Sequence, residues 1–333
     1  MRKNLGKSLV VVLTAILVFS LTAHAANAPK WQSTKTVEIY VPAAAGGNSD
    51  LTARIFAERL TNLTGANFLV VNQTEGGGAV CYNTVMRGAP DGSVIGWFTP
   101  SWITTYLAGT HDCNPLKDFS VPVMTVVLSP YYVIVPKDSP FNTLEDLIAY
   151  CKANPGELVF GMQMGSMSHY FAESFARNVG IELGYVETGS GDAVRVTAIL
   201  GGNIEATLVN GAQAQQYYQA GELKCLVGIF ENPASIPEVM KAIPTLGDLG
   251  YKYVDVLSAN IMFTPVMDDG ITAQIHEAFH KVLHEPAVQE RLISMNNEMV
   301  MIKGFENTMP AIKDLYDSYR KVAQILGTLA PGR

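Results

Sequence analysis

Short apolar runs alternate with amphipathic stretches along this chain, and this alternation restricts the fold more than any other feature. The runs Val37–Val41, Phe68–Asn72 and Val94–Thr99 have the length and composition of buried strands. Between the first two, apolar residues from Leu51 to Leu63 recur at helical spacing, and Pro90-Asp91-Gly92 marks a turn before the third. A β-α-β-α-β order of this kind predicts a mainly parallel sheet with helices on both faces.

A second unit of the same kind begins at Tyr131. Further strand-like runs, among them Tyr131–Val135 and Leu158–Gly161, alternate with helical stretches up to about residue 257. The tail after Pro265 is mostly helical and is expected to pack back on the first unit. We therefore predict an α/β two-lobe fold of the periplasmic binding protein type, type II-like, with the ligand cleft between the lobes. Lobe 1 comprises residues 29–130 plus 259–333, and lobe 2 comprises residues 131–258.

The N-terminus has the layout of a secretory signal peptide. Arg2, Lys3 and Lys7 precede an apolar run from Ser8 to Leu21, and small residues follow at cleavage-site spacing. The run is short for a membrane span. We expect residues 1–28 to be removed near Ala25 or Ala28 and the mature protein to reside in the periplasm.

The charge balance argues against nucleic acid as a partner. The full chain carries a net charge of −7, and removing the leader takes away three basic residues and no acidic one, which leaves −10. An acidic protein without basic runs binds polyanions poorly. An anionic ligand must therefore be held by local dipoles against the overall field of the protein.

The four cysteines match no metal or redox motif. Cys151 and Cys225 fall in apolar stretches and are expected to be buried. Cys81 and Cys113 are the one pair for which a disulfide is considered, since export leads to an oxidising compartment. The sequence leaves that pairing open.

The loop Pro42–Asp50 has the composition of an anion site. It follows the first strand and opens the first helix, and Gly46 and Gly47 permit positive φ and close approach of backbone amides. Asn48, Ser49 or Asp50 is expected to cap the helix. The unpaired N–H groups and the positive dipole end of a helix then attract an anion. Neither a P-loop nor a dinucleotide-binding motif is present, which disfavours nucleotides.

Similar loops recur after later strands. Gly165–Tyr170 offers Ser166, Ser168 and His169 at the start of another helix, and Gly189-Ser190-Gly191 precedes a helix that begins at Asp192. Thr99-Pro100-Ser101 forms a weaker fourth loop. A plain turn explains any one of them. Several Gly/Ser loops between a strand and a helix together indicate the edge at which α/β sheets bind ligands.

Taken together, these motifs resemble those of a known protein family. The chain resembles the solute receptors of tripartite tricarboxylate transporters, the Bug-type proteins, over essentially the whole mature region. The resemblance rests on Val37–Pro42 with Ala45–Asp50, Val71-Asn72 with Gly76–Gly78, Ala89–Gly92, Lys117–Phe119, Leu144–Leu147, Asn154–Gly156, Gly201–Glu205 and Pro244–Leu246.

The resemblance implies a receptor that closes on an organic acid and delivers it to integral membrane transporter subunits. It implies that the amides from Ala45 to Ser49 hold one carboxylate, often with ordered waters, and that Ser166, Ser168 and His169 meet the ligand from the second lobe. Two stretches depart from the family pattern, Gly189–Asp192 and Pro265–Gly270. The first leaves the far side of the pocket, and hence the ligand's identity, open.

The candidate ligand-binding residues are thus Ala45, Gly46, Gly47, Asn48, Ser49, Asp50, Thr99, Ser101, Ser166, Ser168, His169, Ser190, Gly191 and Asp192. The expected ligand is a di- or tricarboxylate, an aromatic acid or an acidic amino acid. No cofactor, metal ligand or catalytic residue is assigned, and a monomer is expected. Arg54, Lys137 and Arg195 are expected to be solvated, because amides and hydroxyls suffice for a carboxylate.

An enzyme is the rival interpretation. His276-Glu277-Ala278-Phe279-His280 matches the HExxH motif of zinc hydrolases. Helical periodicity, however, places Ile275 and Phe279 on the core stripe and moves His276, His280 and His284 progressively toward solvent. No G-x-S-x-G elbow is present for serine chemistry. We therefore expect a receptor and not an enzyme, and the residues do not separate a role in uptake from one in signalling.

Overall fold

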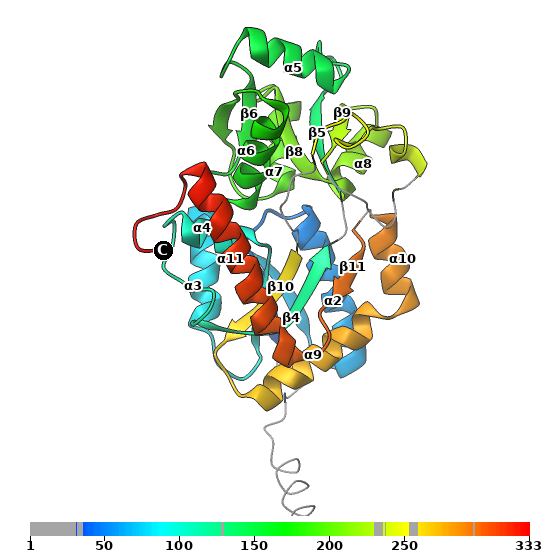
Figure 1. The fold of residues 1–333 in the computed structure, drawn as a ribbon. Helices are drawn as coiled ribbons and strands as arrows, with labels where there is room; N and C mark the ends of the chain where they lie inside the picture. The colour runs from blue at the N-terminus through cyan, green and yellow to red at the C-terminus, as the bar shows by residue number, and fades with distance from the viewer. Residues whose placement is uncertain are drawn as a thin grey trace, which may run out of the picture.

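In the computed structural model, the described residues are 31, 36–127, 130–229, 236, 238–252, 259–295 and 297–333. Their strands form two separate sheets, one of six strands in the order β11-β4-β10-β3-β1-β2 and one of five in the order β7-β6-β8-β5-β9. Below, "first lobe" denotes the six-stranded sheet with helices α2, α3, α4, α9, α10 and α11. "Second lobe" denotes the five-stranded sheet with helices α5, α6, α7 and α8. Figure 1 shows the second lobe above the first.

The first lobe is built from two segments of the chain that are far apart in sequence. Its strands are β1 Val37–Val41, β2 Phe68–Asn72, β3 Val94–Phe98, β4 Phe119–Val127, β10 Ala259–Pro265 and β11 Met299–Met301. Its helices are α2 Asn48–Thr64, α3 Ala79–Met86, α4 Ser101–Leu107, α9 Asp269–Leu283, α10 Pro286–Ser294 and α11 Thr308–Leu326, with short 3-10 turns η1 Glu75–Gly78 and η3 Phe305–Asn307.

The second lobe comes from the middle of the chain. Its strands are β5 Tyr131–Pro136, β6 Val159–Met162, β7 Gly184–Glu187, β8 Ala206–Asn210 and β9 Leu223–Gly228. Its helices are α5 Leu144–Ala153, α6 Met167–Val179, α7 Asp192–Leu200 and α8 Gly211–Gln219, followed by the 3-10 turn η2 Glu238–Met240. Thr143 caps α5 in a full capping box with Asp146.

The α/β class is confirmed, but the expectation of mainly parallel sheets was wrong because both sheets are mixed. In the first lobe β1 pairs in parallel with β2 and β3, whereas β10 runs antiparallel to β3 and β4. In the second lobe β6 pairs in parallel with β7 and β8, whereas β5 runs antiparallel to β8 and β9. The antiparallel strands β4, β5 and β10 lie next to the two changes of lobe, where the βαβ repeat is interrupted.

Strand β4 was not anticipated, and Pro122 explains part of the difficulty. A proline inside an apolar run argues against a central strand, because it cannot donate a hydrogen bond to its neighbour. The β10–β4 pairing shifts register between Met262 and Thr264, and Pro122 falls in that irregular stretch. The strand therefore accommodates the proline by giving up regular pairing there.

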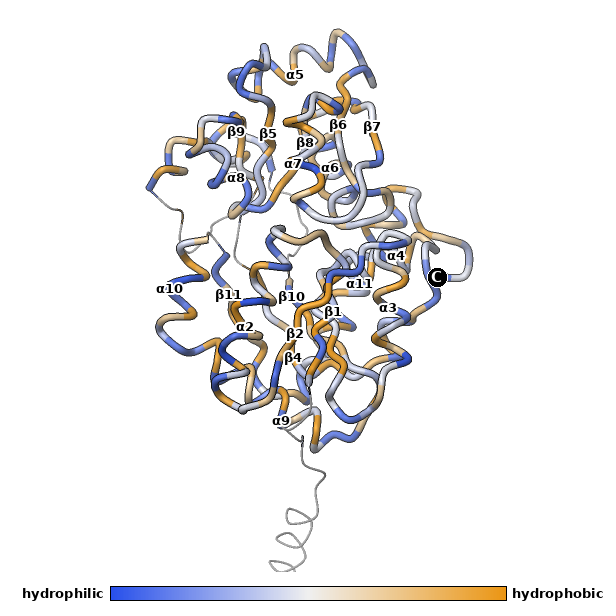
Figure 2. Tube along the Cα trace, turned by 180° about the vertical axis from the view of Figure 1, so that it is seen from behind, coloured by the Kyte–Doolittle hydropathy of each residue, from blue (hydrophilic) through white to orange (hydrophobic). Residues whose placement is uncertain are grey.

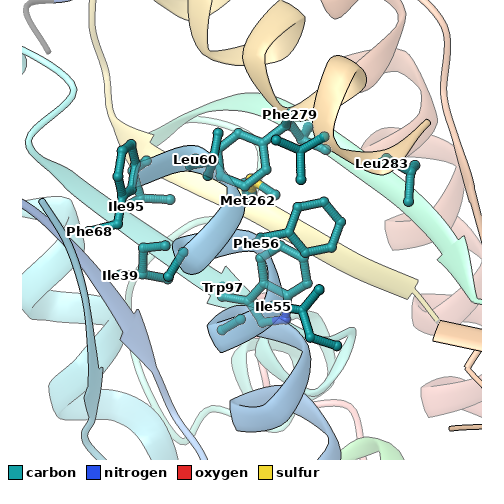
Figure 3. Close-up of a cluster of buried hydrophobic side chains, with 14 of the residues drawn as sticks. Ile39, Ile55, Phe56, Leu60, Phe68, Ile95, Trp97, Met262, Phe279 and Leu283 are labelled. Carbon is teal, nitrogen blue, oxygen red and sulfur yellow. The ribbon is translucent and has the colours of Figure 1, made fainter. Parts of the chain in front are cut away.

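Aromatic side chains fill the core of the first lobe. Phe56 of α2 lies 5.1 Å from the Trp97 ring of β3 and 5.7 Å from the Phe279 ring of α9, between ring centroids. Figure 3 shows these three residues among the aliphatic side chains of the same cluster. The orange, hydrophobic parts of the trace in Figure 2 follow β1, β2 and β6 inside the lobes. The apolar runs read from the sequence thus form the interior.

The structure describes the four cysteines but not the predicted N-terminal leader. All four cysteines are free thiols, so Cys81 and Cys113 are not joined. The predicted signal peptide and its cleavage sites near Ala25 and Ala28 lie outside the described residues. Within the described ranges, no helix has the length and apolar character needed to cross a membrane.

We predict that Phe279→Ala lowers the free energy of unfolding by about 3–5 kcal/mol, because it removes a fully buried ring and leaves a cavity between Phe56 and Trp97. Ile325→Ala is the control, since that side chain is 61% exposed and should change stability by less than about 0.5 kcal/mol. Urea unfolding measures both. Equal effects of the two truncations would contradict the core described above.

Candidate functional site

A cavity of about 60 Å³ lies where the two lobes meet. Its walls come from the loops that follow β1 and β3 in the first lobe and from the starts of α6 and α7 in the second. Figure 1 shows this region between the two sheets. Most of the candidate residues line the cavity: Gly47, Asn48, Ser49, Thr99, Ser101, Ser166, Ser168, Ser190, Gly191 and Asp192. Ala45, Gly46, Asp50 and His169 are not among its lining residues.

The first loop has one residue in the left-handed region, Gly46, with φ +80°. Gly47 is extended and is the N-cap of α2, which begins at Asn48. The expected side-chain cap was wrong, because the N-cap residue is a glycine and makes no such bond. Instead, Asp50 reaches back from the first turn and accepts a hydrogen bond from the Gly46 N–H at 2.9 Å.

Asp50 is committed to interactions inside the first lobe. It is 2% exposed, its carboxylate pairs with Arg54 at 2.9 Å, and it accepts a hydrogen bond from Asn72 at 3.0 Å. Burial raises its pKa, but the hydrogen bonds from Arg54, Gly46 and Asn72 outweigh burial, and the pKa lies below its usual value. Asp50 is therefore an ionised brace for the loop.

The loop before α6 turns two hydroxyls toward the cavity. Ser166 is the N-cap of α6, and its Oγ accepts from the Ser168 N–H at 3.2 Å. Ser168 Oγ accepts from the Gln163 N–H at 3.0 Å and lies 2.8 Å from Ser166 Oγ. Both side chains are buried and line the cavity. Their mutual bonds fix the hydroxyl positions before any ligand arrives.

His169 has a different position from the two serines. Its Nδ1 accepts a hydrogen bond from the Gly165 N–H at 3.1 Å, and its ring lies 5.6 Å from that of Tyr185. Burial lowers its pKa and outweighs the nearby charges of Glu173 and Glu187. The imidazole is therefore neutral and braces the loop, and its role as a ligand contact remains a prediction.

The third loop joins the two lobes directly. Ser190 Oγ donates to the Pro42 carbonyl at 2.5 Å. A Cβ added at Gly191 would lie 3.3 Å from the Ala43 Cβ, so the loops of the two lobes are packed against each other. Gln213 Nε2 donates to the Gly46 carbonyl at 3.2 Å, and Gln163 Nε2 to the Gly77 carbonyl at 3.0 Å. The structure therefore has the lobes closed on the cavity.

The expectation that Arg195 is solvated was wrong. It is 4% exposed, lines the cavity, forms an ion pair with Asp192 and donates to the Leu208 carbonyl at 3.0 Å. Burial raises the pKa of Asp192 even though Arg195 and the Asn210 N–H oppose the shift. Helical spacing of three residues brings the pair together. Arg54 and Lys137 are exposed to solvent at their side chains, as expected.

Several cavity residues were missed by the sequence analysis. Trp97 of β3, Asn260 of β10 and Tyr131 of β5 belong to the strands beneath the loops and line the cavity. The available signal was small: Trp97 stands two residues before Thr99, and Asn260 is a polar residue in an apolar run. Glycines mark the loops in the sequence, whereas a strand residue comes to line a cavity only when the sheets are assembled.

The HExxH motif does not form a metal centre. His276 is buried and its Nδ1 donates to the Pro122 carbonyl at 2.8 Å, while Glu277 is 60% exposed and pairs with Lys281. The rings of His276 and His280 are 6.4 Å apart between centroids. Across the described part of the chain, no group of three or more His, Cys, Asp or Glu residues is arranged to hold a metal ion.

Comparisons with known proteins find relatives over most of the chain. The model of the tripartite tricarboxylate transporter family receptor matches residues 52–327. A UPF0065 protein from the gbd 5' region of Cupriavidus necator is 27% identical over 301 residues, which is 89% of each chain.

Solved structures share the fold. The periplasmic binding protein BugD superposes with a TM-score of 0.80 at 22% identity, covering 89% of this chain and 98% of that one. R. palustris Rpa4515 with adipate gives 0.80 at 23% identity, covering 88% and 98%. MatC from Rhodopseudomonas palustris with bound malate gives 0.75 at 19% identity, covering 86% and 98%. The two-lobe periplasmic binding protein fold is thereby confirmed.

We predict that His169 makes stability depend on pH. Because its folded pKa lies below the ordinary value of 6.5, the unfolded chain binds the proton more readily. The stability it provides is complete above about pH 6.5 and is lost as the pH falls below that value. Urea unfolding from pH 7.5 to 5.0 should therefore show a smaller loss for His169→Gln than for the unsubstituted protein. Parallel profiles would contradict the neutral, buried imidazole.

Proposed function

Because the chain belongs to the tripartite tricarboxylate transporter receptor family, whose fold is that of periplasmic binding proteins rather than enzymes, we propose that it captures a small organic carboxylate by lobe closure. The closed receptor then delivers its ligand to integral membrane transporter subunits. One observation carries this proposal. The N-terminal ends of α2 from the first lobe and of α6 and α7 from the second converge on a single cavity.

The electrostatics of the cavity favour an anion. Helix N-termini present unpaired N–H groups and a positive dipole end. The start of α7 already has a negative group of its own, since Asp192 is its first residue and pairs with Arg195. The first turn of α2 contains Asp50, but this carboxylate pairs with Arg54 and Asn72 and is not among the residues that line the cavity. The starts of α2 and α6 are therefore the ones left for a ligand, one on each lobe. A ligand with two carboxylates, one for each helix, therefore fits this arrangement better than a monocarboxylate.

The size of the cavity favours a small ligand. One water-sized position needs roughly 10–15 Å³ of such volume. A cavity of about 60 Å³ therefore has room for roughly four to six such positions in this closed form. That is the scale of a short organic acid, and it is too small for a nucleotide or a peptide.

Closure is the second part of the mechanism. The direct hydrogen bonds from Ser190, Gln163 and Gln213 to first-lobe carbonyls hold the lobes together around the cavity. A ligand that contacts both lobes adds its own interactions to the closed state alone and shifts the population toward it. In this proposal the chain divides into residues 29–130 plus 259–333 and residues 131–258, and it acts in the periplasm as a monomer.

The relatives support the ligand class. Structures of the same fold have been solved with adipate and with malate, which are both dicarboxylates. In this chain we assign the first carboxylate to the backbone N–H groups at the start of α2, where Gly47, Asn48 and Ser49 line the cavity. The second is assigned to Ser166 and Ser168 at the start of α6.

We predict that a leucine at Gly47 abolishes carboxylate binding. Gly47 has φ −77°, so its backbone accepts a side chain, but the new Cβ would stand 3.3 Å from the Ala44 oxygen and 3.7 Å from the Ala193 Cβ. The remaining leucine atoms then occupy the interface and the cavity. Ala45→Leu is the matched control, because Ala45 belongs to the same loop, is exposed and does not line the cavity.

The measurement is a thermal shift of the protein with a panel that contains malate, adipate, citrate and glutamate. A ligand at about 100 times its Kd stabilises the folded protein by about 2.7 kcal/mol, which is a readily measured rise in Tm. The unsubstituted protein and Ala45→Leu should respond to the same acid, and Gly47→Leu should not. A chain that responds to none of the acids in the panel, or a Gly47→Leu variant that still responds, would refute the proposal.

A further inference from the structure

Two buried polar atoms beside the cavity have no hydrogen-bond partner in the described part of the chain. One is the indole Nε1 of Trp97, and the other is the side-chain oxygen Oδ1 of Asn48. Both residues line the cavity. Buried polar groups in folded proteins are almost always paired, and an unpaired one costs free energy. A ligand that entered the cavity and paired with both atoms would remove that cost.

The position of the indole is fixed by its surroundings. Trp97 has no exposed surface and packs against Phe56 and Phe279, with ring centroids 5.1 Å and 6.5 Å away. Figure 3 shows it in this cluster at the interior of the first lobe. An indole N–H is a donor only. Because the ring cannot turn without disturbing its aromatic neighbours, the direction of this N–H is fixed.

Asn48 provides the complementary group. It is the first residue of α2, and its Oδ1 is an acceptor. Asn48 and Trp97 line the same cavity of about 60 Å³. Across the cavity, Asp192 Oδ2 receives only a long hydrogen bond of 3.4 Å from the Asn210 N–H and adds further acceptor capacity. A ligand atom that pairs with both groups must therefore accept a hydrogen bond from Trp97 and donate one to Asn48.

We propose that the ligand is a carboxylate that carries a hydroxyl group, and that Trp97 and Asn48 recognise this hydroxyl. A hydroxyl oxygen accepts from the indole N–H while its proton is donated to the Asn48 oxygen. A methylene satisfies neither group. An ammonium donates but cannot accept from the indole, and a carboxylate accepts from the indole but leaves the Asn48 oxygen facing a negative charge. This inference rests on the proposed function and narrows its ligand to the hydroxy acids.

The first experiment compares acids that differ by one hydroxyl. Calorimetry with the mature protein uses succinate against L- and D-malate, glutarate against the two 2-hydroxyglutarates, and tricarballylate against citrate. In the pair that fits the cavity, the hydroxylated acid should bind about tenfold or more tightly, because its partner leaves a buried donor and acceptor unpaired. Aspartate and glutamate, in which an ammonium replaces the hydroxyl, should bind more weakly than the hydroxy acid.

The second experiment removes only the indole N–H. Trp97→Phe keeps an aromatic ring in the core and should reduce the preference for the hydroxylated acid by about tenfold, with a much smaller effect on the acid that lacks the hydroxyl. Trp102→Phe is the matched control. Trp102 is also fully buried, its Nε1 has no hydrogen-bond partner among the described residues, and it does not line the cavity. That variant should keep the preference of the unsubstituted protein.

An NMR readout tests the contact itself in the unsubstituted protein. The chain has three tryptophans, and Trp31 Nε1 already donates to the Gly92 carbonyl at 3.1 Å. In the ¹⁵N-labelled protein, one indole signal should shift on saturation with the hydroxy acid and shift less with its unhydroxylated partner. Trp97→Phe assigns that signal.

The outcomes separate this inference from the receptor proposal. Equal affinity within every matched pair, or an unchanged preference in a folded Trp97→Phe variant, would overturn hydroxyl recognition while the receptor function stands. Binding of none of the acids would refute the receptor function itself. Tight binding of an amino acid in preference to every hydroxy acid would also overturn the inference, because the indole N–H would then lack an acceptor.

Discussion

The interactions of the ionised Asp50 carboxylate hold in place the loop of the first lobe that borders the cavity. It receives the Gly46 N–H and the Asn72 amide and pairs with Arg54. Asn72 in turn donates to the Ala43 carbonyl, so the end of β2 is tied to the loop that follows β1. With the loop held from below, the start of α2 is left facing the cavity, where its remaining N–H groups can meet an anion.

In the second lobe, a different set of bonds holds the loops at the cavity in place. Ser166 and Ser168 brace each other at the start of α6, and His169 holds the Gly165 N–H as a neutral acceptor. At the start of α7, Asp192 and Arg195 neutralise each other in a buried pair. The cavity thus contains polar groups of both signs without an unbalanced cationic side chain among its described lining residues. Under the proposed function, oriented dipoles and hydrogen bonds would hold the anion at this site, in a chain whose net charge is negative.

Direct contacts between the lobes make closure partly intrinsic to the protein. The hydrogen bonds of Ser190, Gln163 and Gln213 to first-lobe carbonyls join backbone of one lobe to side chains of the other. Tyr170 of α6 is fully buried among first-lobe residues, 5.9 Å from the Tyr319 ring, and accepts from the Thr328 hydroxyl at 3.2 Å. Under the proposed function, a ligand would need to supply only the remaining free-energy difference between the open and closed states.

The amino-acid sequence by itself determined the local pattern of this protein. The strand–loop–helix order, the start of α7 at Asp192 and the capping box at Thr143 follow from side-chain periodicity and short-range hydrogen bonding. Strand β4 was not predicted, because a proline inside an apolar run argues against a central strand. Its pairing partners also lie far away in sequence. The cavity floor at Trp97 and Asn260, the burial of Arg195 and the distance of His169 from the lining were decided only by the tertiary structure. A side chain's burial and its free hydrogen-bonding groups depend on which distant segments pack around it, and that is settled when two sheets from three stretches of chain come together.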